Sequence, residues 1–107
     1  ELKAAARPLI AKWEKRLNLQ LDRCFVQRMK TKWGSSNPKL HTIRLNLELV
    51  KKPPQCLDYV ILHEMLHFLV ANHGDRFIAL ADRHMPNWRM VRQTLNEAPL
   101  AHAEWAL

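Results

Sequence analysis

Three polar residues interrupt an apolar stretch in the middle of the chain. Within residues 60–71, only His63, Glu64 and His67 carry polar side chains. On a helix, His63 and His67 are separated by about 40° and one turn, so both imidazoles can reach a single ion. Glu64 lies beside them, where a carboxylate can hold the water that completes a metal's coordination and accept its proton. Imidazoles suit Zn²⁺, and burying these groups without partners is costly, so we predict a zinc site on a buried helix.

The third ligand must come from outside this helix. His73 follows His67 by six residues, the spacing of metalloproteases with a His-Glu-x-x-His-x-x-Gly-x-x-His motif, although Val70 replaces their glycine. We therefore expect the chain to turn back later, at Asn72 or Gly74, since both residue types tolerate left-handed backbone. This spacing predicts His73 as the third ligand. The alternative histidines are His84, His41 and His102.

The elements that position these residues follow from the periodicity of the apolar side chains. This periodicity predicts helices over residues 2–17, 55–71, 75–84 and 86–99, and strands over residues 23–32 and 40–45. In the first helix we place Pro8 in the first turn, with a firm start near Arg7, because an interior proline removes a hydrogen bond. Residues 34–38 have the composition of a turn, and Asn46 can cap a helical turn over residues 47–51. The chain is thus predicted to be an α+β domain with a small sheet backed by helices.

Length and charge limit the possible functions. With 107 residues the chain has room for one domain, which we place over residues 1–107. The net charge of +7 favours acidic partners such as nucleic acid, but the basic residues are scattered, as on an ordinary solvated surface. No stretch contains the roughly 18 apolar residues that span a membrane, so we expect no membrane insertion. The chain begins with Glu1 rather than Met, which is compatible with a missing N-terminal portion.

The two cysteines, Cys24 and Cys56, indicate the redox environment. They are widely spaced and form neither a Cys-x-x-Cys pair nor a disulfide framework. We interpret them as reduced thiols, and we therefore predict a cytoplasmic location.

Several short motifs, taken in order, resemble the YgjP-like metallopeptidase family. They are Met-Lys-Thr-Lys-Trp-Gly-Ser at residues 29–35, Ile-Arg-Leu-Asn at 43–46 with Leu49, Asp-Tyr-Val at 58–60 leading into His63-Glu64-x-x-His67, and Asn-His-Gly-Asp-x-Phe at 72–77. The His-Gly-x-x-Phe element is also similar to that of SprT-like proteases. The resemblance covers residues 28–96 and implies a zincin-like fold with a central metal-binding helix. It further implies one zinc ion bound by His63, His67 and His73, with Glu64 as the catalytic residue.

Two positions depart from the usual pattern of this family. The family commonly has Trp-Gly-Ser-Cys, whereas this chain has Trp-Gly-Ser-Ser at residues 33–36. Any role of that cysteine is therefore absent or taken by a hydroxyl. The family also often has an aromatic residue where this chain has Ile78. Neither difference affects the ligands that the resemblance implies.

These features predict a zinc-dependent, metallopeptidase-like hydrolase that acts on a protein or peptide substrate. Glu64 is expected to be the general base toward a metal-activated water that attacks a peptide or amide bond. The candidates for stabilising the developing oxyanion are Tyr59, His41 and Arg44. The candidates for binding the outer ring nitrogens of the histidines are Asp75 and Asn46.

Three other interpretations stay open. The first is a basic, nucleic-acid-associated module with a structural zinc. Such a site usually needs a fourth Cys or His ligand, but Cys56 lies seven residues before His63 and out of register. The second is a SprT-like protease that acts on DNA-bound proteins, and the third is an inactive scaffold that retains the metal. The oligomeric state does not follow from the sequence.

Overall fold

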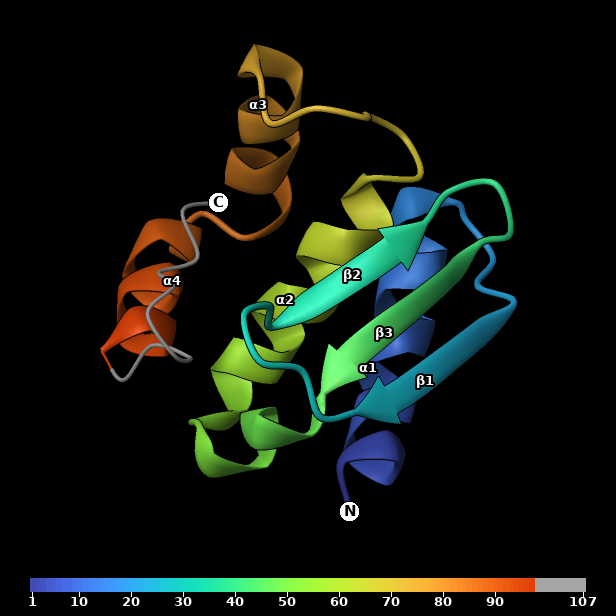
Figure 1. Cartoon of the computed structure of the whole chain (residues 1–107). Coiled ribbons are helices and arrows are strands. Elements are labelled where there is room, and N and C mark those ends of the chain that lie inside the picture. Colours follow the sequence, from blue (N-terminus) through green and yellow to red (C-terminus); the bar gives the residue numbers. More distant parts are fainter. Residues whose placement is uncertain (98–107) are drawn as a thin grey trace.

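Within the described residues, the fold consists of a three-stranded sheet and helices that pack on one of its faces (Figure 1). The computed structural model describes residues 1–97 of the chain. The elements, in order, are α1 (Leu2–Leu17), β1 (Arg23–Gln27), β2 (Gly34–Asn37), β3 (Thr42–Asn46), the short 3-10 helix η1 (Leu47–Lys51), α2 (Pro54–Leu66), α3 (Asp75–His84) and α4 (Trp88–Asn96).

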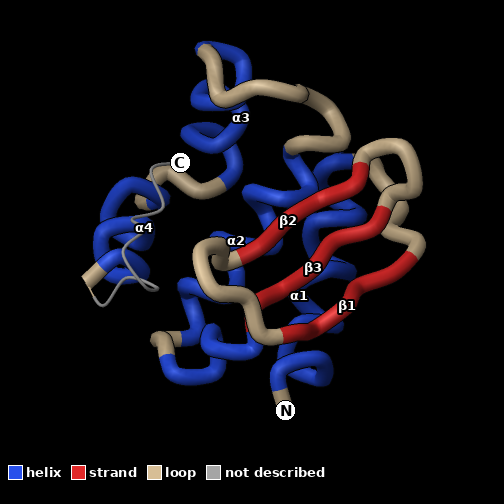
Figure 2. The backbone as a smooth tube through the Cα atoms, in the orientation of Figure 1, coloured by secondary structure: helices blue, strands red, loops and turns tan. Residues whose placement is uncertain are grey.

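Strand β3 lies in the middle of the sheet, whose order is β1-β3-β2 (Figure 2). It runs parallel to β1 and antiparallel to β2, so β1 and β2 form the two edges of the described sheet. Along β3, Ile43 and Leu45 are buried, whereas Arg44 between them is exposed. Successive side chains of a strand point to opposite faces. One face of the sheet therefore meets the helices, and Arg44 marks the opposite face.

Helices α1 and α2 lie side by side behind the sheet (Figures 1 and 2). Helix α2 is the central element, because ten of its 13 residues are buried and it contacts β2, β3 and the other three α-helices. Asp58 joins α2 to α1, since its carboxylate accepts hydrogen bonds of 2.7 Å from both the Lys12 ammonium and the Trp13 indole. Removal of the apolar side chains of α2 from water drives this packing.

The loop of residues 28–33, which leads from β1 to β2, is held by Asn46. This side chain is fully buried. Its amide nitrogen donates to the Met29 carbonyl at 2.8 Å and to the Lys32 carbonyl at 2.7 Å. Its oxygen accepts a hydrogen bond of 3.0 Å from the backbone N–H of Glu48, which makes Asn46 the cap of η1 as predicted. One residue therefore fixes both η1 and the entry into β2.

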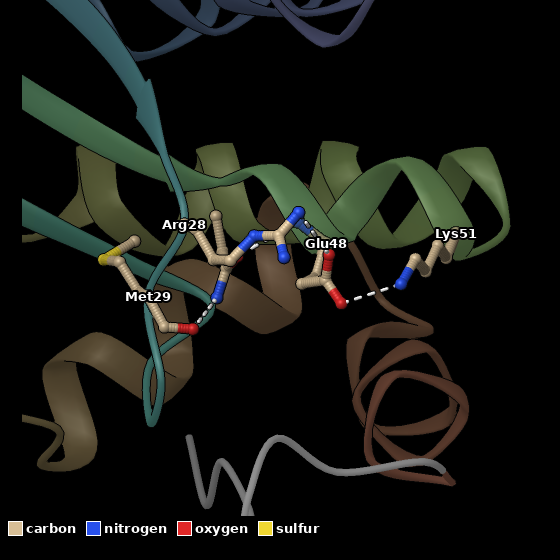
Figure 3. A network of polar contacts seen from close by, with 5 residues as sticks. Arg28, Met29, Glu48 and Lys51 are labelled. Atoms are coloured by element: carbon tan, nitrogen blue, oxygen red, sulfur yellow. Dashed lines mark hydrogen bonds and ion pairs between the residues drawn. The ribbon is translucent and has the colours of Figure 1, made fainter.

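A small ionic network joins the same loop to η1 (Figure 3). Glu48 pairs with Lys51 at 2.9 Å and, more loosely, with Arg28 at 3.9 Å. The hydrogen bond from Lys51 lowers the pKa of the Glu48 carboxyl. Because Arg28 directly follows β1, this network adds a second connection between η1 and the end of that strand.

The strands differ from the sequence-based predictions. The strand predicted over residues 23–32 ends at Gln27, because Asn46 binds the loop carbonyls that follow. The turn predicted at residues 34–38 is wrong, since residues 34–37 form β2. Their small polar side chains are typical of a loop, and the strand forms because β3 pairs with it. The strand predicted over residues 40–45 is β3, which begins two residues later and ends one residue later.

The helices follow the predictions more closely. The helix over residues 75–84 and the turn over residues 47–51 are confirmed. Helix α1 begins at Leu2, so Pro8 lies inside it and not in its first turn. The buried Leu2 and Ala6 hold the segment before Pro8 against the core, which compensates for the lost hydrogen bond.

The other two helices are shorter than predicted. The helix predicted over residues 55–71 spans Pro54–Leu66 and ends five residues early. The helix predicted over residues 86–99 spans Trp88–Asn96, and residues 98 and 99 lie outside the described part.

The described residues confirm an α+β fold with a sheet against a central helix. None of the helices in residues 1–97 combines the length and the apolar character needed to cross a membrane. Cys24 and Cys56 are both free thiols, as expected. That residues 1–107 form one domain stays a prediction.

Candidate metal centre

Two of the expected ligands lie at the C-terminal end of α2. His63 is in the last turn of this helix, and His67 directly follows its end. His67 keeps right-handed helical backbone angles (φ −66°, ψ −14°), so its side chain stays on the face that carries His63. The chain tightens here, through backbone hydrogen bonds of 3.3 Å from His67 to Glu64 and 3.0 Å from Phe68 to Met65. The early end of the helix therefore does not disturb the spacing of the two histidines.

His73 reaches the same place from the loop between α2 and α3. The Asn72 side chain accepts a hydrogen bond of 3.1 Å from the backbone N–H of Gly74, which closes a turn around His73. Nε2 of His73 then lies 2.9 Å from Nε2 of His67. One donor atom from each of His63, His67 and His73 lies within 4.8 Å of the other two. The structure thus brings the three histidines together.

Phe77, near the start of α3, forms an apolar wall behind this cluster. Its ring centroid lies 5.0 Å from His63, 5.0 Å from His67 and 4.9 Å from His73. A buried ring that contacts all three imidazoles restricts their rotation. In the sequence, Phe77 is recognisable only as part of a family motif, because its contacts depend on how α3 packs against α2.

The donor set suits a divalent metal ion. Burial, with His67 and His73 nearby, lowers the pKa of His63 to about 2, and burial and His67 lower the pKa of His73. Both rings are neutral at neutral pH, the form that has a lone pair to donate. Nδ1 of His67 lies 3.2 Å from the Val70 carbonyl, and a proton placed there leaves the Nε2 lone pair facing His73. Nitrogens bound at about 2.1 Å to one tetrahedral ion lie about 3.4 Å apart. The imidazole nitrogens of this cluster are separated by 2.9 Å for His67 and His73 and by at most 4.8 Å for the whole set, so the expected spacing falls between these values.

Glu64 is buried beside the histidines and faces strand β2. Only 3% of the residue is exposed. Burial raises the pKa of Glu64 to about 8, although a hydrogen bond from Ser36 and the charge of Lys32 act in the opposite direction. Strand β2 approaches the carboxylate through Gly34, where a Cβ would lie 3.0 Å from Glu64 Oε2 and 2.8 Å from Val60 Cγ1. This close approach requires a residue without a side chain.

A cavity of about 460 Å³ opens in front of these groups. Its lining includes His63, Glu64, His67, His73, Lys32 and Ser36. A substrate can therefore reach the imidazole cluster and the carboxylate from the same side. The arrangement can hold a metal ion, admit water and accept a proton.

The alternative histidines do not join the cluster within the described residues. His41 stacks on Phe68, with ring centroids 4.5 Å apart, and its Nδ1 lies 2.8 Å from the Gln20 carbonyl. His84, on α3, meets the edge of Trp13 at 6.1 Å. His102 lies outside the described residues.

The hypotheses about supporting residues are partly wrong. Asn46 binds loop carbonyls and a backbone N–H, not an imidazole, and the Val70 carbonyl is the partner of His67 instead. Arg44 lies on the face of the sheet away from α2, where it donates to Gln27 at 2.8 Å, so it does not reach Glu64. The structure also places two further candidates, one from each group. Tyr59 packs between His63 and Trp88, and Asp75 lies in the first turn of α3.

Two solved structures share this fold. One is the crystal structure of the metallopeptidase zymogen of Methanocaldococcus jannaschii jannalysin, with a TM-score of 0.72, 25% sequence identity and coverage of 83% of this chain and 85% of that chain. The other is the crystal structure of the metallopeptidase zymogen of Pyrococcus abyssi abylysin, with a TM-score of 0.73, 16% identity and coverage of 82% and 89%. The fold and the histidine cluster together define a metallopeptidase-like protein, which confirms the predicted fold class.

The sequence family agrees with this class. The model of the YgjP-like metallopeptidase domain matches residues 1–98. The chain therefore belongs to the YgjP-like metallopeptidase family, as its motifs indicate. A search of curated proteins found no match.

Proposed function

We propose that this chain is a zinc-dependent peptidase in which His63, His67 and His73 bind one Zn²⁺ and Glu64 is the general base. The observation that carries the proposal is the cluster of three imidazole donor atoms within 4.8 Å, next to a buried carboxylate at an open cavity. Imidazole ligands favour zinc, and three protein ligands leave a position for water. When bound, zinc would lower the pKa of a water ligand toward about 7 and polarise a substrate carbonyl.

The chain's own residues supply the proton transfers. Glu64 faces the cavity, so its carboxylate can take a proton from water at the site and pass it to the leaving amine. In the metal-free protein burial raises the pKa of Glu64 to about 8, and the positive charge of a bound ion would favour the ionised form that accepts the proton. The neutral imidazoles keep their lone pairs for the ion, and Phe77 keeps their rings in place. A protein or peptide is the proposed substrate because the family is a metallopeptidase family and the structural relative at 25% identity is a metallopeptidase zymogen.

Two finer points are part of this proposal. The free thiols of Cys24 and Cys56 support a cytoplasmic, reducing environment. A catalytic site is favoured over a structural one, because the group of possible ligands found among the described residues contains three members and not four. Action on DNA-bound proteins, like that expected of a SprT-like protease, stays a prediction supported only by the net charge of +7.

The test combines zinc analysis with a peptidase assay on the wild type and Glu64→Gln. We expect about one zinc per chain in both proteins and a loss of activity of roughly 10²- to 10⁴-fold in the variant, because only the proton acceptor is removed. His84→Gln, a histidine outside the cluster, should keep both zinc and activity. A zinc-loaded wild type that cleaves nothing in broad peptide and protein panels would support the inactive scaffold. Salt-dependent DNA binding that survives zinc removal would support the nucleic-acid module.

A further inference from the structure

Strand β2 faces the candidate site with alternate residues. Gly34 pairs with Leu45 and Ser36 pairs with Ile43, and both partners are buried on the helix side of the sheet. Paired residues of neighbouring strands place their side chains on the same face. Ser36 therefore points toward α2, whereas Ser35, which pairs with the exposed Arg44, points to the opposite face.

Ser36 and Glu64 line the same cavity, so the Ser36 hydroxyl lies on the side of the sheet that faces the carboxylate. A hydrogen bond from this hydroxyl opposes the rise that burial causes in the pKa of Glu64. Glu64 is only 3% exposed, and a carboxylate in such a buried residue needs donors, because burying it without partners is costly. Lys32 acts on Glu64 only through its charge. Of these two groups, Ser36 alone can fix the direction of the carboxylate, because a hydrogen bond depends on angle as well as distance.

The space around the carboxylate is also restricted. Gly34 approaches so closely that a Cβ there would lie 3.0 Å from Glu64 Oε2 and 3.1 Å from Glu64 Cγ. The glycine limits the movement of the side chain toward the strand, and the Ser36 hydroxyl holds its oxygen end. Both contacts come from β2, the edge strand that lines the cavity.

We propose that Ser36 is a positioning residue, whose hydroxyl holds the Glu64 carboxylate in the orientation that accepts a proton at the cavity. This inference rests on the proposed function, because it assigns Ser36 a role through the general base. Removal of the hydroxyl leaves the backbone pairing of β2 with β3 intact. The carboxylate then gains rotational freedom without losing its position on α2.

The first test compares kcat and KM in Ser36→Ala, Ser36→Thr and the control Ser35→Ala. The hydrogen bond to a charged group predicts a fall in kcat of about 10- to 100-fold in Ser36→Ala, with KM and zinc content unchanged. Ser36→Thr, which keeps a hydroxyl, should recover most of kcat. Ser35 also borders the cavity, but it pairs with the exposed Arg44, so Ser35→Ala should lower kcat much less than Ser36→Ala. A kcat for Ser36→Ala within about twofold of the wild type overturns the inference. A failure of Ser36→Thr to recover activity, or a loss of zinc in Ser36→Ala, assigns Ser36 a structural role and also overturns it.

The second test does not depend on catalysis and uses the zinc-free protein. The melting temperatures of the wild type, Ser36→Ala, Glu64→Gln and the double variant form a double-mutant cycle. Non-additive shifts for this pair, with additive shifts for Ser35→Ala and Glu64→Gln, support the contact. Additive shifts for Ser36 and Glu64 overturn the inference even when the enzyme is active. If the wild type cleaves nothing, the proposed function fails, and this cycle still decides whether Ser36 holds Glu64.

Discussion

The contact between β2 and α2 at Gly34 makes the Gly34→Ala variant informative. The added methyl would lie 2.8 Å from Val60 Cγ1, 3.0 Å from Glu64 Oε2 and 3.1 Å from Glu64 Cγ. Carbon atoms pack at about 3.5–4.0 Å, so the methyl overlaps its nearest neighbour by roughly 0.7 Å or more. Val60 is fully buried on a helix and its branched side chain has few alternative rotamers. The strand, the helix or the Glu64 side chain must therefore move.

The expected cost follows from two opposing effects. Overpacking a buried site costs about 1–3 kcal/mol. Replacement of glycine by alanine reduces the entropy of the unfolded chain, which stabilises the folded state by about 0.4–1 kcal/mol. The net loss is about 1–2 kcal/mol, which lowers the melting temperature of a chain this size by roughly 4–16 °C. Displacement of Glu64 should also lower kcat by roughly 10²-fold, since a shift of about 1 Å has that effect on a positioned group.

The assay is thermal unfolding by circular dichroism together with kcat for peptide cleavage. Gly74→Ala is the comparison for stability alone, because its methyl would meet only the exposed Asn72 Oδ1 at 3.0 Å, the atom that also accepts the hydrogen bond closing the turn around His73. We expect a change in melting temperature within about 3 °C for that variant. A Gly34→Ala protein that is as stable and as active as the wild type would refute the close packing of β2 against Glu64.

Three further predictions concern the residues that hold this arrangement. Asn46→Asp keeps the cap of η1 but loses both hydrogen bonds to the loop carbonyls. The free energy of unfolding, measured with urea, should therefore fall by about 2–4 kcal/mol. A fall below about 1 kcal/mol would contradict the role of this residue. Asp58→Ala removes the acceptor shared by Lys12 and Trp13, and should lower the free energy of unfolding by about 1–3 kcal/mol in the same assay. An unchanged free energy would show that these hydrogen bonds between α1 and α2 do not stabilise the fold. In the zinc-free protein, folding raises the pKa of Glu64 from 4.5 to about 8. The native state therefore binds more protons than the unfolded state in this window, and the wild type should lose stability relative to Glu64→Gln as the pH rises from about 4.5 to 8, by at most about 1.4 kcal/mol per pH unit. A pH-independent difference would contradict the burial of the carboxylate.

The helical part of the candidate site follows from the sequence because it depends on local geometry. The period of an α-helix fixes the angle between His63 and His67, and the surrounding apolar residues identify α2 as buried. His73 is also close in sequence, so a single turn at Asn72 brings it to the cluster. Even the early end of α2 at Leu66 leaves this result unchanged, since His67 keeps helical backbone angles.

The sheet side of the site depends on contacts between distant residues, and the sequence predicts it less well. Residues 34–37 look like a loop and become a strand only by pairing with β3. The preceding strand ends at Gln27 because Asn46, far along the chain, binds the carbonyls of the next residues. The position of Ser36 beside Glu64 at the cavity, and the packing of Phe77 against the three histidines, require this tertiary arrangement. The Trp-Gly-Ser-Ser motif at residues 33–36 was the one local indication that this segment matters.

X-ray absorption at the zinc edge, measured on the zinc-loaded protein, tests the central claim most directly. We expect three imidazole nitrogens and one further oxygen at about 2.0–2.1 Å, and the loss of one imidazole in His73→Ala. A sulfur ligand at about 2.3 Å, or a fourth protein nitrogen that fills the open position, would contradict a catalytic site built from His63, His67 and His73.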